Sequence, residues 1–226
     1  MSKLSFAGLC RLGTAGALLV LLALSAGCSG LSATATPQPS FYSLDSALID
    51  ARATSGAPAT AANSLPTLIV NPPHAVSGFD SQRIIYVREA HKLEYFAHSE
   101  WVDTPARMIA PLIITAVEST GQFRAAVLTP SAVSGDLRLD TEIMRLQHDF
   151  NSVPSRVRFT LRAYIIDNTT RKMVAWREFD ESATAVSENP YGGVVAANRV
   201  VRTVLEQLAS FCGITAENWR AAAAGR

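Results

Sequence analysis

The first 28 residues restrict this chain most, because they decide which part of it folds and in which compartment. Lys3 and Arg11 precede an apolar stretch over residues 12–26, and Cys28 follows that stretch closely. A basic start, a short apolar core and small residues before a cut site are typical of a secretory signal peptide. The apolar run is about 15 residues long, whereas a membrane-spanning helix needs roughly 20. We therefore predict that residues 1–27 are a signal peptide.

The five residues that end at Cys28, Leu24-Ser25-Ala26-Gly27-Cys28, resemble the lipobox of bacterial lipoproteins. Ser25 departs from that motif, in which Leu is commoner. In lipoproteins such a Cys is lipidated, and its acyl chains anchor the protein because each buried CH₂ contributes about 0.8 kcal/mol. Cys28 is thus the predicted lipidation site; ordinary cleavage beside an unmodified Cys28 is the alternative. Ser29 stands where Asp would favour the inner membrane in enterobacteria, so we expect the periplasmic face of the outer membrane.

Removal of the signal peptide leaves slightly more acidic than basic residues. The full chain has 20 Lys and Arg against 19 Asp and Glu, and Lys3 and Arg11 leave with the signal peptide. No basic excess remains to attract nucleic acid or anionic lipid head groups. Cys10 also leaves, and Cys28 is used for lipid, so Cys212 has no partner for an intramolecular disulfide. Its apolar helical surroundings predict a buried thiol.

The remaining chain of about 200 residues suits a single domain. Residues 28–40 are rich in Ser, Ala, Thr and Pro and have little apolar surface to bury, which predicts a flexible tether. We assign residues 41–226 to one domain. Few large apolar residues occur at about 46–66, so we expect a long surface loop there.

Two helices are predicted from apolar spacing and from their end signals. Thr104-Pro105 and Asn189-Pro190 each place an N-cap residue before a Pro that suits the first helical position. Gly121 and Gly213 are interpreted as the ends of the two helices. An amphipathic stripe follows each start, so both helices are expected to cover a sheet.

About seven strands are expected from alternating or short apolar runs. The clearest alternation lies at 136–143, which loses phase near Met144 as a bulge would cause, and at 156–165. In the second of these, the predicted inward residues are Val157, Phe159, Leu161, Ala163 and Ile165. The other apolar runs are 41–44, 67–70, 83–87, 93–98, 124–129 and 173–181. We expect an α/β (α+β-like) fold: a mixed, largely antiparallel sheet, mostly joined by hairpins, with two amphipathic helices packed on it.

The predicted mature chain has no pattern typical of catalysis or of metal and cofactor binding. Its two lysines, Lys92 and Lys172, do not follow a Gly-rich loop, so there is no Walker A motif. The four histidines lack metal-binding spacing, and neither C-x-x-C nor G-x-S-x-G occurs. We therefore predict no cofactor, no metal and no catalytic residue.

An aromatic-rich segment runs directly into the first predicted helix. It contains Tyr95, Phe96 and Trp101. Core packing between sheet and helix is the first interpretation of these rings. Binding to a partner is the second, because Trp and Tyr are common anchors of protein interfaces.

Four segments carry a resemblance to a known family: Phe41-Tyr42-Ser43-Leu44, residues 81–86, Tyr95 to Trp101, and Asn189-Pro190-Tyr191-Gly192-Gly193. With the lipobox, they are similar to ABC-type transport auxiliary lipoproteins, which include the paraquat-inducible C lipoproteins. The resemblance implies a mixed-sheet fold and a non-catalytic role beside an ABC permease complex and a mammalian-cell-entry-domain protein. Such systems move lipids or other hydrophobic compounds across the envelope.

Two other function classes stay open at this point. One is a periplasmic lipoprotein that carries lipid in a pocket of its own, and the other is a periplasmic enzyme. A homo-oligomer is a further expectation, since several tethered copies would strengthen weak contacts through a high effective concentration.

Overall fold

The computed structural model describes residues 38–45 and 65–225 of the 226-residue chain. The described residues from Pro39 onward belong to one compact unit. The signal peptide, Cys28, nearly all of the tether and nearly all of the loop at about 46–66 lie outside the described residues. Their assignments therefore stay predictions.

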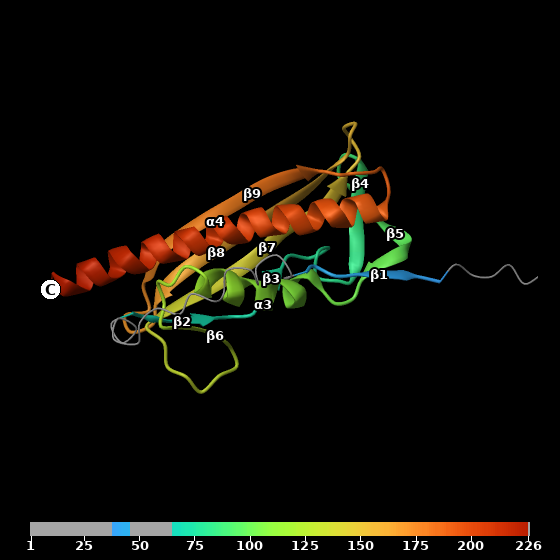
Figure 1. The fold of residues 1–226 in the computed structure, drawn as a ribbon. Coiled ribbons are helices and arrows are strands. Elements are labelled where there is room, and N and C mark those ends of the chain that lie inside the picture. Colours follow the sequence, from blue (N-terminus) through green and yellow to red (C-terminus); the bar gives the residue numbers. More distant parts are fainter. Residues whose placement is uncertain (1–37, 46–64, 226) are drawn as a thin grey trace, which may run out of the picture. The chain divides into compact units, whose positions relative to one another are not determined.

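The described chain forms a nine-stranded sheet with two helices (Figure 1). In chain order the elements are β1 (Ser40–Tyr42), β2 (Thr67–Val70), β3 (His74–Ala75), β4 (Arg83–Glu89), β5 (Lys92–Trp101), α3 (Pro105–Glu118), β6 (Ala125–Leu128), β7 (Leu137–Asp149), β8 (Arg156–Asp167), β9 (Met173–Thr184) and α4 (Pro190–Ala224).

The sheet is assembled on β7. Along one edge β7 pairs in parallel with β2, then β3, then β4, and along the other edge it pairs antiparallel with β8. β2 lies beside Leu137 to Leu139, whereas β4 lies beside His148 and Asp149. β6 extends the sheet beyond β2, β5 and β1 extend it beyond β4, and β9 extends it beyond β8. Two groups of strands therefore occupy opposite ends of one edge of β7.

The expectation of a mixed, largely antiparallel sheet with two helices is confirmed. The longest ladders, β7–β8 and β8–β9, are antiparallel hairpins. A mixed sheet implies some parallel pairs, but the sequence did not indicate which strands form them. β2, β3 and β4 run parallel to β7, β6 runs parallel to β2, and β1 runs parallel to β5. Parallel neighbours need long crossover connections, and local turn signals do not reveal those.

A bulge in β7 keeps its apolar side chains on one face. The register with β8 shifts between Ile143 and Arg145, as the loss of phase near Met144 predicted. Buried positions before the shift are Leu137, Leu139, Thr141 and Ile143. After it, the buried positions are Leu146 and His148. One extra residue thus changes buried positions from odd to even numbers while the same face stays covered.

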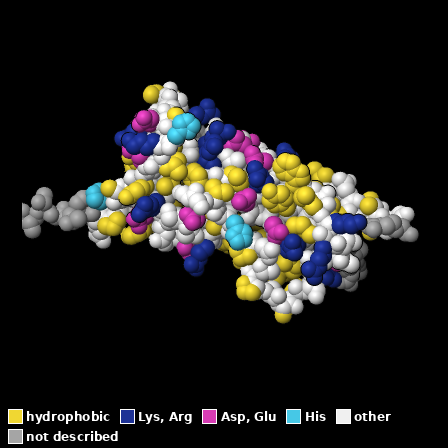
Figure 2. Space-filling view, turned by 180° about the vertical axis from the view of Figure 1, so that it is seen from behind, with side chains coloured by type: hydrophobic (Ala, Val, Ile, Leu, Met, Phe, Trp, Pro, Cys, Tyr) yellow, Lys and Arg dark blue, Asp and Glu magenta, His cyan; other side chains and the backbone are white. Residues whose placement is uncertain are grey.

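One hydrophobic core joins the sheet to both helices. The predicted inward residues of β8 are all buried: Val157, Phe159, Leu161, Ala163 and Ile165. α3 and α4 pack against each other, and α4 also packs against β8 and β9. The alternate residues of β8 and β9 point to the sheet face opposite the helices. Figure 2, which views the molecule from behind, shows this face.

α4 continues to Ala224, so the prediction that Gly213 ends the helix is wrong. A Cβ atom at Gly213 would lie 3.3 Å from Cγ of Gln122, and this glycine instead permits a close approach of α4 to the loop after α3. The buried stripe continues to Ala216. Beyond it, Nε1 of Trp219 donates a hydrogen bond to Oδ2 of Asp167 at 2.9 Å. Packing beyond Gly213 therefore outweighs the helix-ending preference of glycine.

The two helix starts are confirmed, but only one uses the predicted cap. Oδ1 of Asn189 accepts a hydrogen bond from the backbone N–H of Gly192 at 2.9 Å. Thr104 occupies the N-cap position of α3, but its side chain makes no capping hydrogen bond. Its own N–H donates to Oδ1 of Asp103, and its carbonyl accepts from Arg107 and Met108.

Trp101 should be a large contributor to stability, because it is 3% exposed within this core. We expect Trp101→Ala to lower the free energy of unfolding by about 3–5 kcal/mol, measured by urea denaturation. Trp176→Ala is the matched control, since Trp176 is 59% exposed and should change stability by no more than about 0.5 kcal/mol. Wild-type stability of Trp101→Ala would contradict the packing role.

Candidate interaction surfaces

The structure places the three aromatic residues of β5 in three different environments. Trp101 lies in the core. Phe96 is partly buried, and its ring centroid lies 4.6 Å from that of Tyr86. Tyr95 is 51% exposed, and the guanidinium carbon of Arg83 lies 4.1 Å from its ring centroid. Trp101 therefore packs in the core, whereas the ring of Tyr95 is exposed at the surface beside Arg83.

One pair of side chains has the distance expected of a nucleophile and its base. Nε2 of His148 lies 2.7 Å from Oγ of Ser155. His148 is 2% exposed, however, and Ser155 is fully buried. Glu188, the nearby acid, accepts a hydrogen bond from the backbone N–H of Ser155 at 2.8 Å. A substrate has no access to this hydroxyl, so the arrangement is suited to structure. His148 and Ser155 are seven residues apart in the chain and match no catalytic motif, and our sequence analysis missed the pair.

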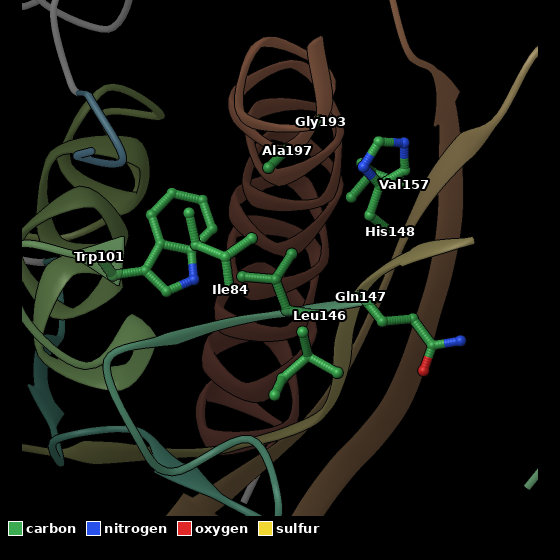
Figure 3. A pocket seen from close by; sticks show the side chains of 9 residues that line it. Ile84, Trp101, Leu146, Gln147, His148, Val157, Gly193 and Ala197 are labelled. Atoms are coloured by element: carbon green, nitrogen blue, oxygen red, sulfur yellow. The ribbon is translucent and has the colours of Figure 1, made fainter. Parts of the chain in front are cut away.

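His148 fills the seam between β7 and the start of α4 (Figure 3). A Cβ atom at Gly193 would lie 2.5 Å from Nδ1 of His148, so the absent side chain of Gly193 makes room for the imidazole. The ring of Phe150 lies with its centroid 4.1 Å from that of His148. Among the described residues, Nδ1 of His148 has no hydrogen-bond partner. Burial lowers the pKa of His148, although Glu188 and Asp149 favour its charged form.

The cavity beside His148 is too small for a lipid chain. It is lined by side chains of the sheet and of α4, including Ile84, Trp101, Leu146 and Ala197 (Figure 3). Its volume is about 10 Å³, which is enough for at most one water molecule. Sites for small molecules usually measure some 300–1,000 Å³. This cavity therefore cannot hold a lipid chain.

Paired charges cover much of the sheet face opposite the helices (Figure 2). Arg158 on β8 pairs with Asp180 on β9 and lowers the pKa of that carboxyl to about 2. Arg162 lies between Glu178, at 2.7 Å, and Glu142, at 4.0 Å. Exposed pairs of this kind contribute little to stability, about 0–1 kcal/mol each. Because acids and bases alternate, they give this face no strong charge of one sign.

The β8–β9 hairpin adds an exposed apolar patch beside an open strand edge. Tyr164 and Trp176 are register partners, and Trp176 and Met173 are 59% and 57% exposed. With Arg162 and Glu178 they line an open depression of about 390 Å³. The outer edge of β9 pairs with no described strand. We call Tyr164, Met173, Trp176 and this edge the β9 surface.

The β9 surface has the properties of a site that binds polypeptide. An unpaired strand edge can accept a strand of another chain, and an exposed Trp can fill a pocket of that chain. The sequence predicted a strand at 173–181 as the hairpin partner of the strand before it. What the sequence did not reveal is that β9 lies at an edge with Trp176 facing away from the helices.

The described residues offer few other candidates. They contain no group of three or more His, Cys, Asp or Glu residues placed to hold a metal ion. None of the described helices has the length and apolar character needed to cross a membrane. Cys212 is buried, as expected, and burial raises the pKa of its thiol to about 12.

His148 should make stability depend on pH. Its pKa is lowered in the folded state from an ordinary value near 6.5, so the folded protein binds this proton less well than the unfolded chain. The stability it contributes is therefore complete above about pH 6.5 and is lost as the pH falls through that value toward the folded pKa. Urea denaturation at pH 7.5 and 5.0 should show a larger loss for the wild type than for His148→Gln. Equal losses would contradict this account.

Comparisons with known proteins identify the family of the chain and structures with a similar fold. A model of the family "ABC-type transport auxiliary lipoprotein component" matches residues 47–209. No curated protein matches the chain. The crystal structure of protein XCC0632 from Xanthomonas campestris, which carries the family name DUF330, is similar with a TM-score of 0.64 and 20% identity. The similarity covers 68% of this chain and 87% of that one.

A second crystal structure, of an uncharacterized protein, has a TM-score of 0.55 and 10% identity, over 78% of this chain and 97% of that one. At these identities the two structures establish the fold alone. The family match spans well over half of the chain and agrees with the resemblance found in the sequence. The chain belongs to the ABC-type transport auxiliary lipoprotein component family.

Proposed function

We propose that this protein is a lipid-anchored, non-catalytic component of an ABC-type envelope transport system for lipids or other hydrophobic compounds. Its family membership supports an auxiliary role in ABC transport. The observation that carries the proposal further is the β9 surface, where Trp176 is 59% exposed beside an open strand edge. A surface of this kind suits protein binding better than chemistry.

The proposed anchor is the lipidated Cys28, on the periplasmic face of the outer membrane. The lipobox-like residues before Cys28 support lipidation, and Ser29 supports the outer membrane over the inner one. The tether at 28–40 then links the anchor to the domain, which presents its surfaces to the periplasm.

The proposed partner is the mammalian-cell-entry-domain protein of the same system, with its ABC permease complex. The β9 surface would bind it by adding a strand to the edge of β9 while Trp176 enters a pocket of the partner. Alternating charges of Arg158, Asp180, Arg162 and Glu178 beside this surface would fix the register of the two chains. Several tethered copies would strengthen such contacts.

Neither alternative function gains support from the described residues. A lipid carrier needs a large apolar cavity, whereas the core cavity measures about 10 Å³. An enzyme needs an accessible reactive group, whereas the His148–Ser155 pair is buried.

Cys28→Ala should abolish metabolic labelling by radioactive or clickable palmitate and release the domain from membranes, because no other residue of the predicted mature chain lies in a lipobox. Cys212→Ala is the matched control and should label like the wild type, since its thiol is buried. Density-gradient fractionation of the wild type should place it with outer membranes. Labelling of Cys28→Ala at the wild-type level would exclude Cys28 as the anchor.

Trp176→Ala should weaken binding of the mammalian-cell-entry protein by about 30-fold or more, as expected for an interface hot spot. The measurement is pull-down and titration with the detergent-solubilised full chain. Val133→Ala is the control, because Val133 is similarly exposed, at 51%, on the loop before β7. Binding should not depend on added nucleotide or metal. Equal affinity of Trp176→Ala and wild type would remove the β9 surface from the interface.

A further inference from the structure

We propose that the outer face of β1 and of the adjoining part of β5 rests on the lipid bilayer in which Cys28 is anchored. This surface, which we call the tether-end surface, consists of Phe41, Leu93, Tyr95 and Val102. The inference rests on the proposed lipidation of Cys28 and adds a second membrane contact to it.

The pairing of β1 with β5 places two exposed apolar side chains together. Phe41 is the register partner of Glu100, and the N–H of Val102 donates to the carbonyl of Tyr42 at 2.8 Å. Because neighbours in a strand alternate between faces, Val102 and Glu100 share the face opposite the buried Trp101. Phe41 therefore lies on the same outer face as Val102. The two side chains are 59% and 49% exposed.

Tyr95 extends this apolar surface along β5. Arg83 on β4 is the register partner of Glu100, and its guanidinium covers the ring of Tyr95 at 4.1 Å. Tyr95 thus lies next to the face that carries Phe41. Leu93, two residues earlier, is 48% exposed. Aromatic rings beside basic groups are typical of the water–lipid interface, where the ring enters the lipid and the charge stays hydrated.

The charges around the tether-end surface are balanced. Lys92 lies within 3.9 Å of Glu89 and 3.6 Å of Glu94. Arg107 pairs with Asp103 at 3.1 Å. A contact driven by attraction to anionic lipids would need an excess of Lys and Arg, which this surface lacks. The contact we propose is therefore apolar and independent of anionic lipid.

The length of the tether identifies the bilayer as the occupant. About 12 residues separate Cys28 from β1, so β1 begins no more than about 40 Å from the lipid anchor, at about 3.3–3.6 Å per residue. As a flexible chain the same tether has a mean span of about 20 Å. A surface held so close to the bilayer meets it at a high effective concentration.

The β9 surface is farther from the anchor along the sheet. Trp176 is paired through Tyr164 to Asp140, near the start of β7, whereas β4 joins the end of β7 at His148 and carries β5 on its far side. Eight residues of strand correspond to about 27 Å. Of these two surfaces, the tether-end surface thus meets the membrane and the β9 surface stays free for a protein.

The test uses the full lipidated chain in phosphatidylcholine vesicles whose acyl chains carry a spin-label quencher. Phe41→Cys is labelled with an environment-sensitive fluorophore, and Val102→Cys is a second variant in case the first does not fold. Val133→Cys is the control on the loop before β7, with comparable exposure of the native side chain, 51%. Cys212 should resist labelling, because burial raises its pKa to about 12.

We expect at least threefold stronger quenching at positions 41 and 102 than at 133. The difference should persist in 1 M salt and without anionic lipid. Flotation of the vesicles tests the anchor separately. If the protein floats but quenching is equal at all positions, the membrane contact is overturned while the anchor is kept. A fluorescence shift at position 41 without quenching has the same consequence, because it indicates a protein neighbour or a second copy. Failure to float would overturn the anchor and this inference with it.

Discussion

The pairing of β7 with four strands is the constraint on which the rest of the structure depends. One edge of β7 holds β2, β3 and β4 in succession, and the other edge holds β8. The bulge between Ile143 and Arg145 lets both halves of β7 keep their buried residues under the helices. As a result, β1 and β5 are fixed at one end of β7, near the tether, and the turn of the β8–β9 hairpin at the other. The two exposed apolar surfaces owe their separation to this arrangement.

The same core explains why the His148–Ser155 pair does not resemble a working active site. Gly193 lets α4 approach His148 so closely that the imidazole becomes part of the packing. Its polar atoms are satisfied by Ser155 on one side only, and Glu188 is committed to the backbone of Ser155. The exposed side chains of the described residues include a sheet face of paired charges and an aromatic hairpin, and both suit the auxiliary role of the family.

Sequence analysis predicted those features that depend on neighbours along the chain. The alternation in β8 identified all five of its inward residues, and the phase loss near Met144 identified the bulge, because burial of one sheet face imposes a period of two. Features that depend on distant neighbours were missed. Gly213 looked like a helix end, but its role is set by Gln122 on a separate element. Nothing local separates Tyr95, which is exposed, from Trp101, which is buried, since the difference arises from irregular pairing with β4. Ser155 follows His148 by only seven residues, but the residues that bury the pair, Glu188 and Gly193, come from the start of α4 and the segment before it.

The central claim is that one chain meets lipid at its tether end and protein at its β9 edge. Photo-crosslinking in intact cells tests this most directly, with a photoreactive amino acid placed at position 41 in one strain and at position 176 in another. The account predicts adducts with phospholipid from position 41 and with the mammalian-cell-entry-domain protein from position 176, identified by mass spectrometry. Protein adducts from position 41 together with lipid adducts from position 176 would contradict it.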